Sequence, residues 1–432
     1  MRVGVVPNLE RGGGGIYQYA VTLVSVLPEF LDERDELIVF LYGGEDLPDD
    51  LRARGYRCVE MRSVQGVGAG LWYWMGDVLP GSALAGLRRM FGRKSDPGAT
   101  GGSGGSIQDI ESLVDPAWRS FFAGYGVDLL IFTSDVDLAY RTGIPYVVAV
   151  HDIHHRLHPE FPEVSADGEW ERREFRIGNC VRYAAGILVD SEVGKEDIVE
   201  AYGPDEDAVS IVPFVPASYL DTNVGPERIQ QVRNEWNLPR EFVFYPAAFW
   251  PHKNHILIVE AISLLRRAEI DVHIVLTGPN GGSHLRRDTF DRAMAAARVF
   301  GVDDLVHYLG YVDDETMSVL YHEASALVMP TFLGPTNIPV VEALKFGCPV
   351  ITSNVRGIRD HVRGAALLVD PYSAGSIADG MRRVLENPEL ASELREAGYA
   401  HLEAYSNSGF AVRVKRALEQ ALRRIASRAE HG

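Results

Sequence analysis

The sequence predicts an α/β protein built from two doubly wound domains, because short apolar runs alternate with longer helical patterns over almost its whole length. This alternation is typical of βαβ units and therefore of a mostly parallel sheet. The pattern stops near residues 220–240 and starts again after Pro239, which predicts a hinge followed by a second sheet. A chain of 432 residues has room for two or three domains of roughly 100–200 residues each.

The predicted strands are short runs rich in β-branched residues. In the first domain, residues 1–225, they lie at 3–6, 37–41, 128–132, 146–150 and 186–189. In the second domain, residues 240–408, they lie at 242–246, 272–277, 306–309, 326–329, 349–351 and 367–369. Helical patterns separate them, as the connections between parallel strands require.

One stretch departs from this alternation. Residues 92–106 read GRKSDPGATGGSGGS, a Gly/Ser-rich composition that predicts a flexible loop. It follows an apolar segment at 71–75 and a helical segment at 83–91 that contains Arg88 and Arg89. We interpret this region as a core helix with a surface loop, and a lid that binds the acceptor or touches a membrane is the alternative.

The C-terminal segment, residues 409–432, predicts an amphipathic helix. Its apolar residues recur at helical spacing, at Val412, Val414, Leu418, Leu422 and Ile425. Six basic residues lie between them, at Arg413, Lys415, Arg416, Arg423, Arg424 and Arg428. We expect the apolar stripe to pack against the protein, with docking on a membrane as the alternative.

Composition narrows the class of partner. Hydrophobic residues at 46% and charged residues at 24% are typical of a folded globular protein. A formal charge of -18 disfavours nucleic acid and anionic bilayers as partners unless a basic patch is present. The three isolated cysteines exclude a disulfide framework and a Cys-rich zinc site. Without a signal peptide or a long apolar run, we expect a cytoplasmic protein, with peripheral contact at the inner face of a membrane kept open.

Consecutive glycines follow the first predicted strand and precede a helix that starts near Ile16. Gly13, Gly14 and Gly15 allow a ligand to approach the backbone closely, and the helix N-terminus favours an anion. We therefore predict that this loop contacts phosphate or the acceptor, with a simple tight turn as the alternative.

His151 follows the predicted strand at 146–150, at the carboxyl end where open parallel sheets bind their ligands. We expect a functional role that does not involve a metal, and a structural or surface histidine is the alternative.

Metal binding is a separate alternative for this region. His154 and His158 are four residues apart, although Pro159 would end a helix early and zinc sites need three or four ligands. Asp135 and Asp137 resemble a metal-binding pair, but a solvated loop is the expectation. A metal-dependent hydrolase would use the cluster His151, Asp152, His154 and His155.

The second domain has a stronger set of signals. Lys253 and His252 come just past a predicted strand, at the start of a helix expected near His255. A fixed cation beside a helix N-terminus can hold a phosphate. Gly278 lies in residues 275–282, where another strand leads into a loop of small residues.

The next loop follows the strand at 326–329. Thr336, Asn337 and Ile338 offer backbone amides there, and Glu342 lies in the first turns of the following helix. Phosphates would repel that carboxylate, so its natural partner is a neutral diol such as ribose.

With these motifs in order, the chain resembles a retaining glycosyltransferase of the GT-B fold, from family four (glycosyl transferases group 1), across essentially its full length. The resemblance rests on Gly12–Gly15, His151-Asp152, Asp190-Ser191-Glu192, residues 249–254, Gly310-Tyr311-Val312, residues 337–343 and residues 347–351. It implies two Rossmann-like domains facing each other across a cleft. It also implies that Lys253 neutralises the donor diphosphate, Glu342 holds the ribose, Gly310, Tyr311 and Val312 border the base, and His151 contacts the donor sugar.

Two positions depart from the family pattern. The family usually has two glutamates eight positions apart, and the position eight before Glu342 is Gly334. The family also often has an arginine five before the lysine or directly before it, where this chain has Ala248 and His252. His252 could substitute for the arginine, with a charge that depends on pH.

The sequence thus predicts a glycosyltransferase that moves a hexose-type sugar from a nucleotide diphosphate sugar to an acceptor hydroxyl with retention of configuration. His151 and Lys253 are the predicted catalytic residues. The acceptor is expected to be a sugar, a lipid-linked compound or a small molecule, with no nucleic acid partner and no required metal or other cofactor. Two alternatives remain, the metal-dependent hydrolase and a nucleotide-sugar-binding protein without turnover. The oligomeric state is open.

Overall fold

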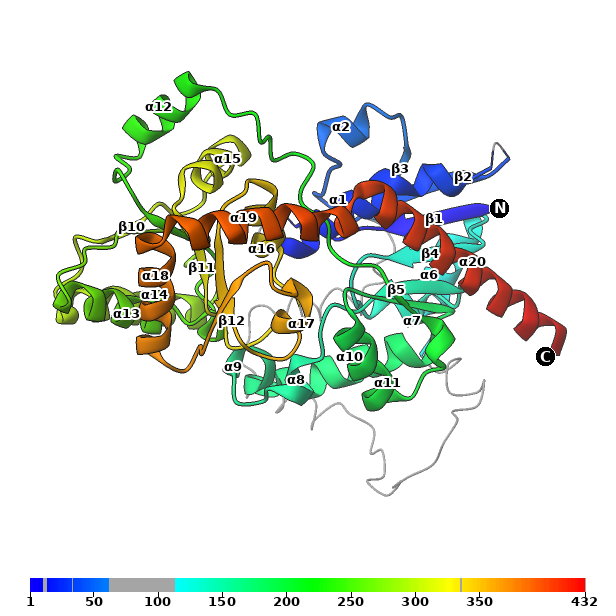
Figure 1. Cartoon of the computed structure of the whole chain (residues 1–432). Helices are drawn as coiled ribbons and strands as arrows, with labels where there is room; N and C mark the ends of the chain where they lie inside the picture. Colours follow the sequence, from blue (N-terminus) through cyan, green and yellow to red (C-terminus); the bar gives the residue numbers. More distant parts are fainter. Residues whose placement is uncertain (11–13, 33, 62–112, 335, 432) are drawn as a thin grey trace.

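The computed structural model describes residues 1–10, 14–32, 34–61, 113–334 and 336–431. Within these ranges the chain forms two α/β domains, each with its own parallel sheet (Figure 1). This confirms the predicted fold class. The predicted loop at 92–106 and the segments at 71–75 and 83–91 lie outside the described residues, as does Gly13.

The first domain has a seven-stranded sheet in the order β3-β2-β1-β4-β5-β6-β7, and every neighbouring pair is parallel. Its strands are β1 (Arg2–Val6), β2 (Glu36–Leu41), β3 (Arg57–Glu60), β4 (Leu129–Phe132), β5 (Tyr146–Ala149), β6 (Gly186–Val189) and β7 (Val209–Ile211). The sequence did not predict β3 and β7. β3 is a largely exposed edge strand and β7 has three residues, so neither shows the apolar run that marks the central strands.

Helices cover both faces of this sheet. They are α1 (Gly15–Val26), η2 (Leu27–Phe30), α2 (Asp49–Arg52), α6 (Pro116–Gly124), α7 (Leu138–Arg141), α8 (His154–Leu157), α9 (Pro162–Ser165), η3 (Ala166–Gly168), α10 (Glu169–Tyr183), α11 (Glu192–Tyr202) and η4 (Glu206–Ala208). Because side chains alternate along a strand, Ile131 faces one core with α1, whereas Leu130 faces the other with α6, α10 and α11.

The second domain has a six-stranded parallel sheet in the order β10-β9-β8-β11-β12-β13. Its strands are β8 (Val243–Pro246), β9 (Ile274–Thr277), β10 (Val306–Tyr308), β11 (Ala326–Met329), β12 (Val350–Ser353) and β13 (Leu367–Val369). Its helices are α12 (Pro226–Glu235), η5 (Pro251–Lys253), α13 (His255–Arg267), α14 (His284–Phe300), α15 (Asp314–Glu323), α16 (Ile338–Lys345), α17 (Ile358–Val362), α18 (Ala374–Glu386), α19 (Pro388–Leu402) and η6 (Glu403–Tyr405). Each strand predicted in this domain is present.

The chain crosses between the domains twice. The first crossing lies just before the predicted hinge, since Val215 belongs to the first core and Ala217 to the second. Lys345 Nζ fixes this crossing by donating to Ala217 O (2.8 Å) and Leu220 O (2.5 Å). Part of the predicted hinge is helical, because α12 occupies residues 226–235.

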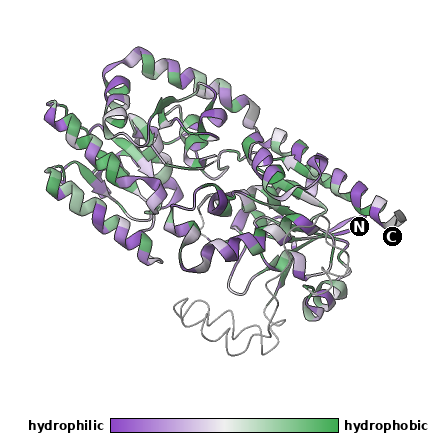
Figure 2. Ribbon diagram, turned by 90° about the horizontal axis from the view of Figure 1, so that it is seen from below, coloured by the Kyte–Doolittle hydropathy of each residue, from purple (hydrophilic) through white to green (hydrophobic). Residues whose placement is uncertain are grey.

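The second crossing is α20 (Asn407–His431), which returns to the first domain. Val414 and Leu418 of the predicted apolar stripe are buried against that domain, and Phe410 is buried beside them. Val412 is not part of the stripe, since it is 57% exposed. Figures 1 and 2 place both chain ends at the first domain. No helix among the described residues has the length and apolar character needed to cross a bilayer.

Candidate functional site

The candidate site lies where the carboxyl ends of the two sheets meet at the domain boundary. From the second domain, Lys253 follows β8, Gly278 follows β9 and Gly310 follows β10. From the first domain, His151 follows β5 and Asp190 follows β6. Open parallel sheets bind ligands at this edge, so the topology alone brings these positions together.

Lys253 is held rigidly at this edge. Tyr245 Oη donates to the carbonyl of Lys253 (2.6 Å), and the next residue, Asn254, has a left-handed backbone (φ 64°). The Asn254 side chain donates to Pro330 O (2.8 Å) and Pro371 O (2.7 Å). Burial lowers the pKa of Lys253 to about 8, although the charges of Glu163 and Asp152 act in the opposite direction. Lys253 is therefore largely cationic at pH 7 and placed beside an anion-binding edge.

The loop before α16 contacts this lysine. Lys253 Nζ donates to Asn337 Oδ1 (3.3 Å), and Asn337 Nδ2 donates to Thr331 Oγ1 (3.3 Å). Asn337 precedes α16 but makes no side-chain cap with it, so its side chain does not occupy the N-terminal amides of the helix. Ile338 begins the helix and is itself buried. A cation and a helix N-terminus thus lie together here.

Glu342 lies one turn into α16 and is only 6% exposed. Tyr321 Oη donates to its Oε2 (2.6 Å). Burial raises the pKa of Glu342 to about 7, although the Tyr321 hydrogen bond and Lys345 oppose this shift. One carboxylate oxygen therefore already accepts a hydrogen bond from Tyr321, and Oε1 is the oxygen better placed to accept one from a ligand.

Gly278 and Gly310 form a wall of backbone where β9 and β10 end. Gly278 has φ 120°, and a Cβ there would lie 2.6 Å from Ala247 O, so only glycine fits. Its amide donates to Gly310 O (2.9 Å). Tyr311 is 68% exposed, whereas Val312 is buried in the second core. Of the predicted base-bordering residues, Val312 can therefore contribute only through its backbone.

His151 lies on the first-domain side, between two aromatic rings. It stacks on Phe214 (ring centroids 5.5 Å apart) and meets the edge of Tyr19 (4.9 Å). Its Nε2 lies 2.9 Å from Thr133 O. Because a carbonyl only accepts, Nε2 has the proton and Nδ1 remains for a ligand.

Two carboxylates of the first domain reach the second domain directly. Glu163 Oε1 accepts from His252 N (2.9 Å) and His252 Nδ1 (2.6 Å). Asp190 Oδ2 accepts from Thr336 Oγ1 (2.5 Å). Burial raises the pKa of Asp190 to about 6, with the Thr336 hydrogen bond opposing it.

His252, which could substitute for the family arginine, is bound to Glu163 of the first domain. Burial lowers the pKa of His252, although Glu163 opposes this shift, so the ring is largely neutral at pH 7. Its amide and Nδ1 are both taken by Glu163. His252 therefore links the two domains and supplies no second cation to the site.

The glycine loop has a role that the sequence did not predict. A Cβ on Gly15 would lie 2.5 Å from Ile338 Cδ1, so this glycine lets the start of α1 approach α16 of the other domain. Gly14 has φ 55°. The two glycines stand at the domain boundary, beside the helix that follows the Thr336–Asn337 loop.

A cavity of about 300 Å³ opens between the domains next to these residues. From the first domain it is lined by His151, Asp152 and His154, and from the second domain by Phe332, Gly334 and Arg356. Arg356 bridges the domains at its rim, with ion pairs to Asp197 (2.6 Å) and Glu196 (2.9 Å).

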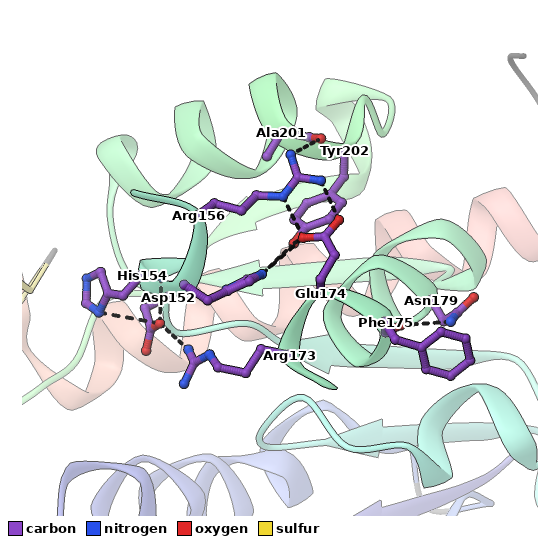
Figure 3. Close-up of polar contacts among 10 residues, drawn as sticks. Asp152, His154, Arg156, Arg173, Glu174, Phe175, Asn179, Ala201 and Tyr202 are labelled. Carbon is purple, nitrogen blue, oxygen red and sulfur yellow. Dashed lines mark hydrogen bonds and ion pairs between the residues drawn. The ribbon is translucent and has the colours of Figure 1, made fainter. Parts of the chain in front are cut away.

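The histidines after β5 do not converge on one point. His151 turns to Thr133, His154 lies beside Asp152 (3.4 Å), and His155 contacts Glu174 (3.1 Å). Glu174 also binds Arg156 and Tyr202, and Figure 3 shows this group apart from Asp152. In the described part of the chain, no three His, Cys, Asp or Glu side chains are grouped to hold a metal. The predicted hydrolase cluster is therefore not formed by these residues.

Asp135 and Asp137 lie in the loop before α7, where Asp137 is exposed to solvent as expected, whereas Asp135 is partly buried. Asp135 pairs with Arg176 of α10 (2.8 Å), and Asp137 accepts a hydrogen bond from Tyr140. The loop is therefore fixed against neighbouring helices.

Sequence reasoning missed several residues of the boundary. Glu163 and Arg356 lie in ordinary polar stretches with no motif, and only their contacts across the domains single them out. Asp190 was named only as part of a family motif, although its place after a parallel strand could have marked it as a site residue.

Comparison with known proteins agrees with this geometry. Residues 227–401 match the family model described as Glycosyl transferases group 1. The chain is 22% identical over 291 residues to the serotype-specific mannosyltransferase WbdA of Escherichia coli, covering 66% of this chain and 34% of WbdA. It is 26% identical over 284 residues to a D-inositol 3-phosphate glycosyltransferase of Pseudarthrobacter chlorophenolicus, covering 64% of each. The chain thus spans about a third to two thirds of these relatives.

Solved structures resemble the whole chain. The structure of Anabaena Alr3699/HepE in complex with UDP and glucose has a TM-score of 0.68 and 15% identity, covering 97% of this chain and 99% of that one. A sucrose-phosphate synthase from Thermosynechococcus elongatus has a TM-score of 0.67 and 15% identity, covering 98% and 99%. These likenesses confirm the predicted GT-B fold, and the second domain matches the predicted family of group 1 glycosyl transferases.

Proposed function

We propose that this chain, whose second domain matches the group 1 glycosyl transferases, moves a hexose-type sugar from a nucleotide diphosphate sugar to an acceptor hydroxyl. The observation that carries the proposal is the meeting of Lys253 with Asn337 at the start of α16, opposite His151. A cation and a helix N-terminus at the carboxyl edge of a sheet form a site for a diphosphate.

The chemical step breaks the bond between the anomeric carbon and the diphosphate oxygen, and forms a bond from that carbon to the acceptor oxygen. The acceptor proton passes to the departing phosphate, and the anomeric configuration is retained. Negative charge grows on the leaving diphosphate, so Lys253 and the α16 amides interact more strongly in the transition state than in the ground state. A well-placed donor of this kind supplies about 3–4 kcal/mol.

The nucleoside end of the donor fits the Gly278–Gly310 wall. Glu342 keeps Oε1 for a ribose hydroxyl, since Tyr321 holds Oε2. The exposed Tyr311 ring lies next in sequence to Gly310 and offers an apolar surface for a base.

His151 lines the cavity beyond the diphosphate site, and the transferred sugar would lie in this cavity. With Nε2 bound to Thr133 O, its Nδ1 accepts a hydrogen bond from a sugar hydroxyl. The step needs no metal, because Lys253 and backbone amides provide the positive charge.

The named activities of similar proteins support this proposal. Two of them are called a mannosyltransferase and a glycosyltransferase, and a third was solved with UDP and glucose. These names favour a nucleotide-sugar donor and a hexose for this chain as well.

The test is release of nucleoside diphosphate from UDP-glucose, GDP-mannose and dTDP-glucose with sugar acceptors, with and without EDTA. We expect release from one donor class that EDTA does not change, and NMR of the product should show the donor's anomeric configuration. Loss of turnover in EDTA would favour metal-dependent chemistry. Binding without release across the panel would favour a non-catalytic protein.

A further inference from the structure

One wall of the cavity between the domains consists of a glycine and two aromatic rings. Gly334 lines it from the second domain, with φ 136° and no side chain to offer a hydroxyl. Phe332 and Tyr372 complete that wall with two rings whose centroids are 4.8 Å apart. The second domain therefore contributes apolar surface at this point of the cavity.

Asp152 faces this wall from the first domain, and its carboxylate is held from one side only. Oδ1 accepts a hydrogen bond from His154 N (3.0 Å) and pairs with Arg173 of α10. Among the described residues, the hydrogen bonds and ion pairs of Asp152 all involve Oδ1. In Figure 3 no dashed line reaches its second oxygen. The side chain remains 29% exposed, and it lines the cavity. Oδ2 is therefore an oriented acceptor without a partner in the part of the chain that the structure describes.

The charge of Asp152 is also maintained. Burial opposes its ionisation, but the charges of His154 and Arg173 outweigh burial and hold the pKa of Asp152 below its usual range. Arg173 supplies a permanent positive charge, so the carboxylate stays ionised at neutral pH. An ionised oxygen accepts stronger hydrogen bonds than a neutral one.

The position next to Lys253 decides which part of a substrate reaches this carboxylate. Phe332, which lines the cavity, donates its amide hydrogen to the carbonyl of His252 (2.9 Å), the residue before Lys253, so the cavity begins beside the diphosphate site. A group attached to a diphosphate on Lys253 would therefore extend into the cavity, between Asp152, His151 and Gly334. The volume of the cavity, about 300 Å³, is at the lower end of the range for small-molecule sites, roughly 300–1,000 Å³.

We propose that Asp152 of the first domain accepts hydrogen bonds, through Oδ2, from hydroxyl groups of the transferred sugar. Arg173 is the positioning residue that holds Oδ1. This inference rests on the proposed function and deepens it: the carboxylate that selects the sugar comes from the domain opposite the nucleotide. The ligand class is a sugar with free hydroxyls rather than an anionic one, because a carboxylate would repel a second anion.

The test compares each nucleotide with its sugar. Calorimetry with UDP, UDP-glucose, GDP and GDP-mannose gives the gain in affinity due to the sugar, as the ratio of two dissociation constants. Asp152→Asn should keep the affinity for the free nucleoside diphosphate within about twofold and reduce the sugar-dependent gain by about tenfold or more, the range for a lost hydrogen bond to a charged group.

Asp135→Asn is the matched control. Asp135 also pairs with an arginine of α10, Arg176 (2.8 Å), but it does not line the cavity. This variant loses a similar ion pair from the same helix, so it should leave the sugar-dependent gain unchanged. If both variants reduce the gain equally, the effect comes from α10 and not from sugar recognition, and the inference is overturned.

Arg173→Gln provides a second measurement if Asp152→Asn does not fold. It releases Oδ1 while keeping the carboxylate, so a loss of a few-fold in the sugar-dependent gain is expected, with unchanged nucleoside diphosphate affinity. If the sugar-dependent gain is unchanged in both Asp152→Asn and Arg173→Gln, the role of Asp152 is overturned and the proposed function stays intact. An effect confined to the acceptor KM also overturns it, since the cavity would then hold the acceptor. Failure of the wild type to bind any nucleotide would instead reject the proposed function itself.

Discussion

On the second-domain face of the site, the loops are held by hydrogen bonds to backbone carbonyls and by close backbone packing at a glycine. The first-domain face instead presents carboxylate side chains. On the second-domain face, Asn254 ties two loops together by donating to carbonyls at 2.8 and 2.7 Å, and Gly278 has room for no side chain. On the first-domain face, Asp152, Glu163 and Asp190 present oxygens to the cavity or to the other domain.

This difference separates two kinds of function. Rigid backbone with one fixed cation suits the part of a donor that is common to many substrates, the nucleoside diphosphate. Side-chain oxygens can differ from one protein to another without changing the fold, so the first-domain face is suited to selecting the sugar. Removing single groups from each face should separate these two functions.

Lys253→Met should have the largest effect, lowering kcat by about 10²–10³-fold, because charge on the leaving diphosphate grows in the transition state. Steady-state kinetics with saturating donor measures it. Lys253→Arg, which keeps the charge, should recover part of the activity. A Lys253→Met enzyme with normal kcat and only a raised KM would reduce Lys253 to an anchoring role.

His151→Ala should lower transfer by roughly 10²-fold while leaving the affinity for free nucleoside diphosphate nearly intact. It tests the first-domain face alone, because its ring lies between Tyr19 and Phe214, which both belong to the first domain. Turnover and calorimetry on the same preparation measure it. A lower melting temperature with normal turnover would make His151 a structural residue.

Glu342→Ala should raise the donor KM by the equivalent of about 1–3 kcal/mol, because a ribose contact is lost and Tyr321 Oη is left without its buried acceptor. Tyr321→Phe is the matched comparison, since it keeps the carboxylate and should affect KM less. Unchanged nucleotide affinity for Glu342→Ala in calorimetry would exclude the ribose contact.

The pH profile tests the second-domain cation. Burial lowers the pKa of Lys253 to about 8, so in the free enzyme the ammonium form is present below that pH and is lost as the pH rises through it. We expect kcat/KM to fall by about tenfold per pH unit above pH 8, because kcat/KM reports the free enzyme. Lys253→Arg should remove this decline, and a decline that persists must come from another group.

Thr336→Val should have the smallest effect, a few-fold loss of turnover and a decrease of about 1–3 kcal/mol in the free energy of unfolding, because buried Asp190 loses a hydrogen-bond donor. Thr336→Ser keeps the hydroxyl and is the control. Urea unfolding and activity assays at pH 7 measure both. Equal behaviour of the two variants would mean that the contact between Thr336 and Asp190 contributes nothing.

The sequence predicted the second-domain site well because its motifs are local. Lys253 directly follows a strand and precedes a helix, and Glu342 lies in the helix after a strand-ending loop, so position along the chain already implies position on the sheet. The same logic placed His151. It did not predict that Tyr321, 21 positions before Glu342, takes one of the carboxylate oxygens.

Residue order by itself determined the two parallel sheets, their central strands, the amphipathic C-terminal helix and the placement of Lys253, Glu342 and His151 at strand ends, because these depend on apolar periodicity and on connections that span few residues. Only the tertiary structure decided that Glu163 binds His252, that Gly15 leaves room for Ile338, and that Asp152 and Gly334 line the same cavity. Each of these depends on how two separate domains dock. Residues there are far apart in sequence, so no local pattern could predict their contacts.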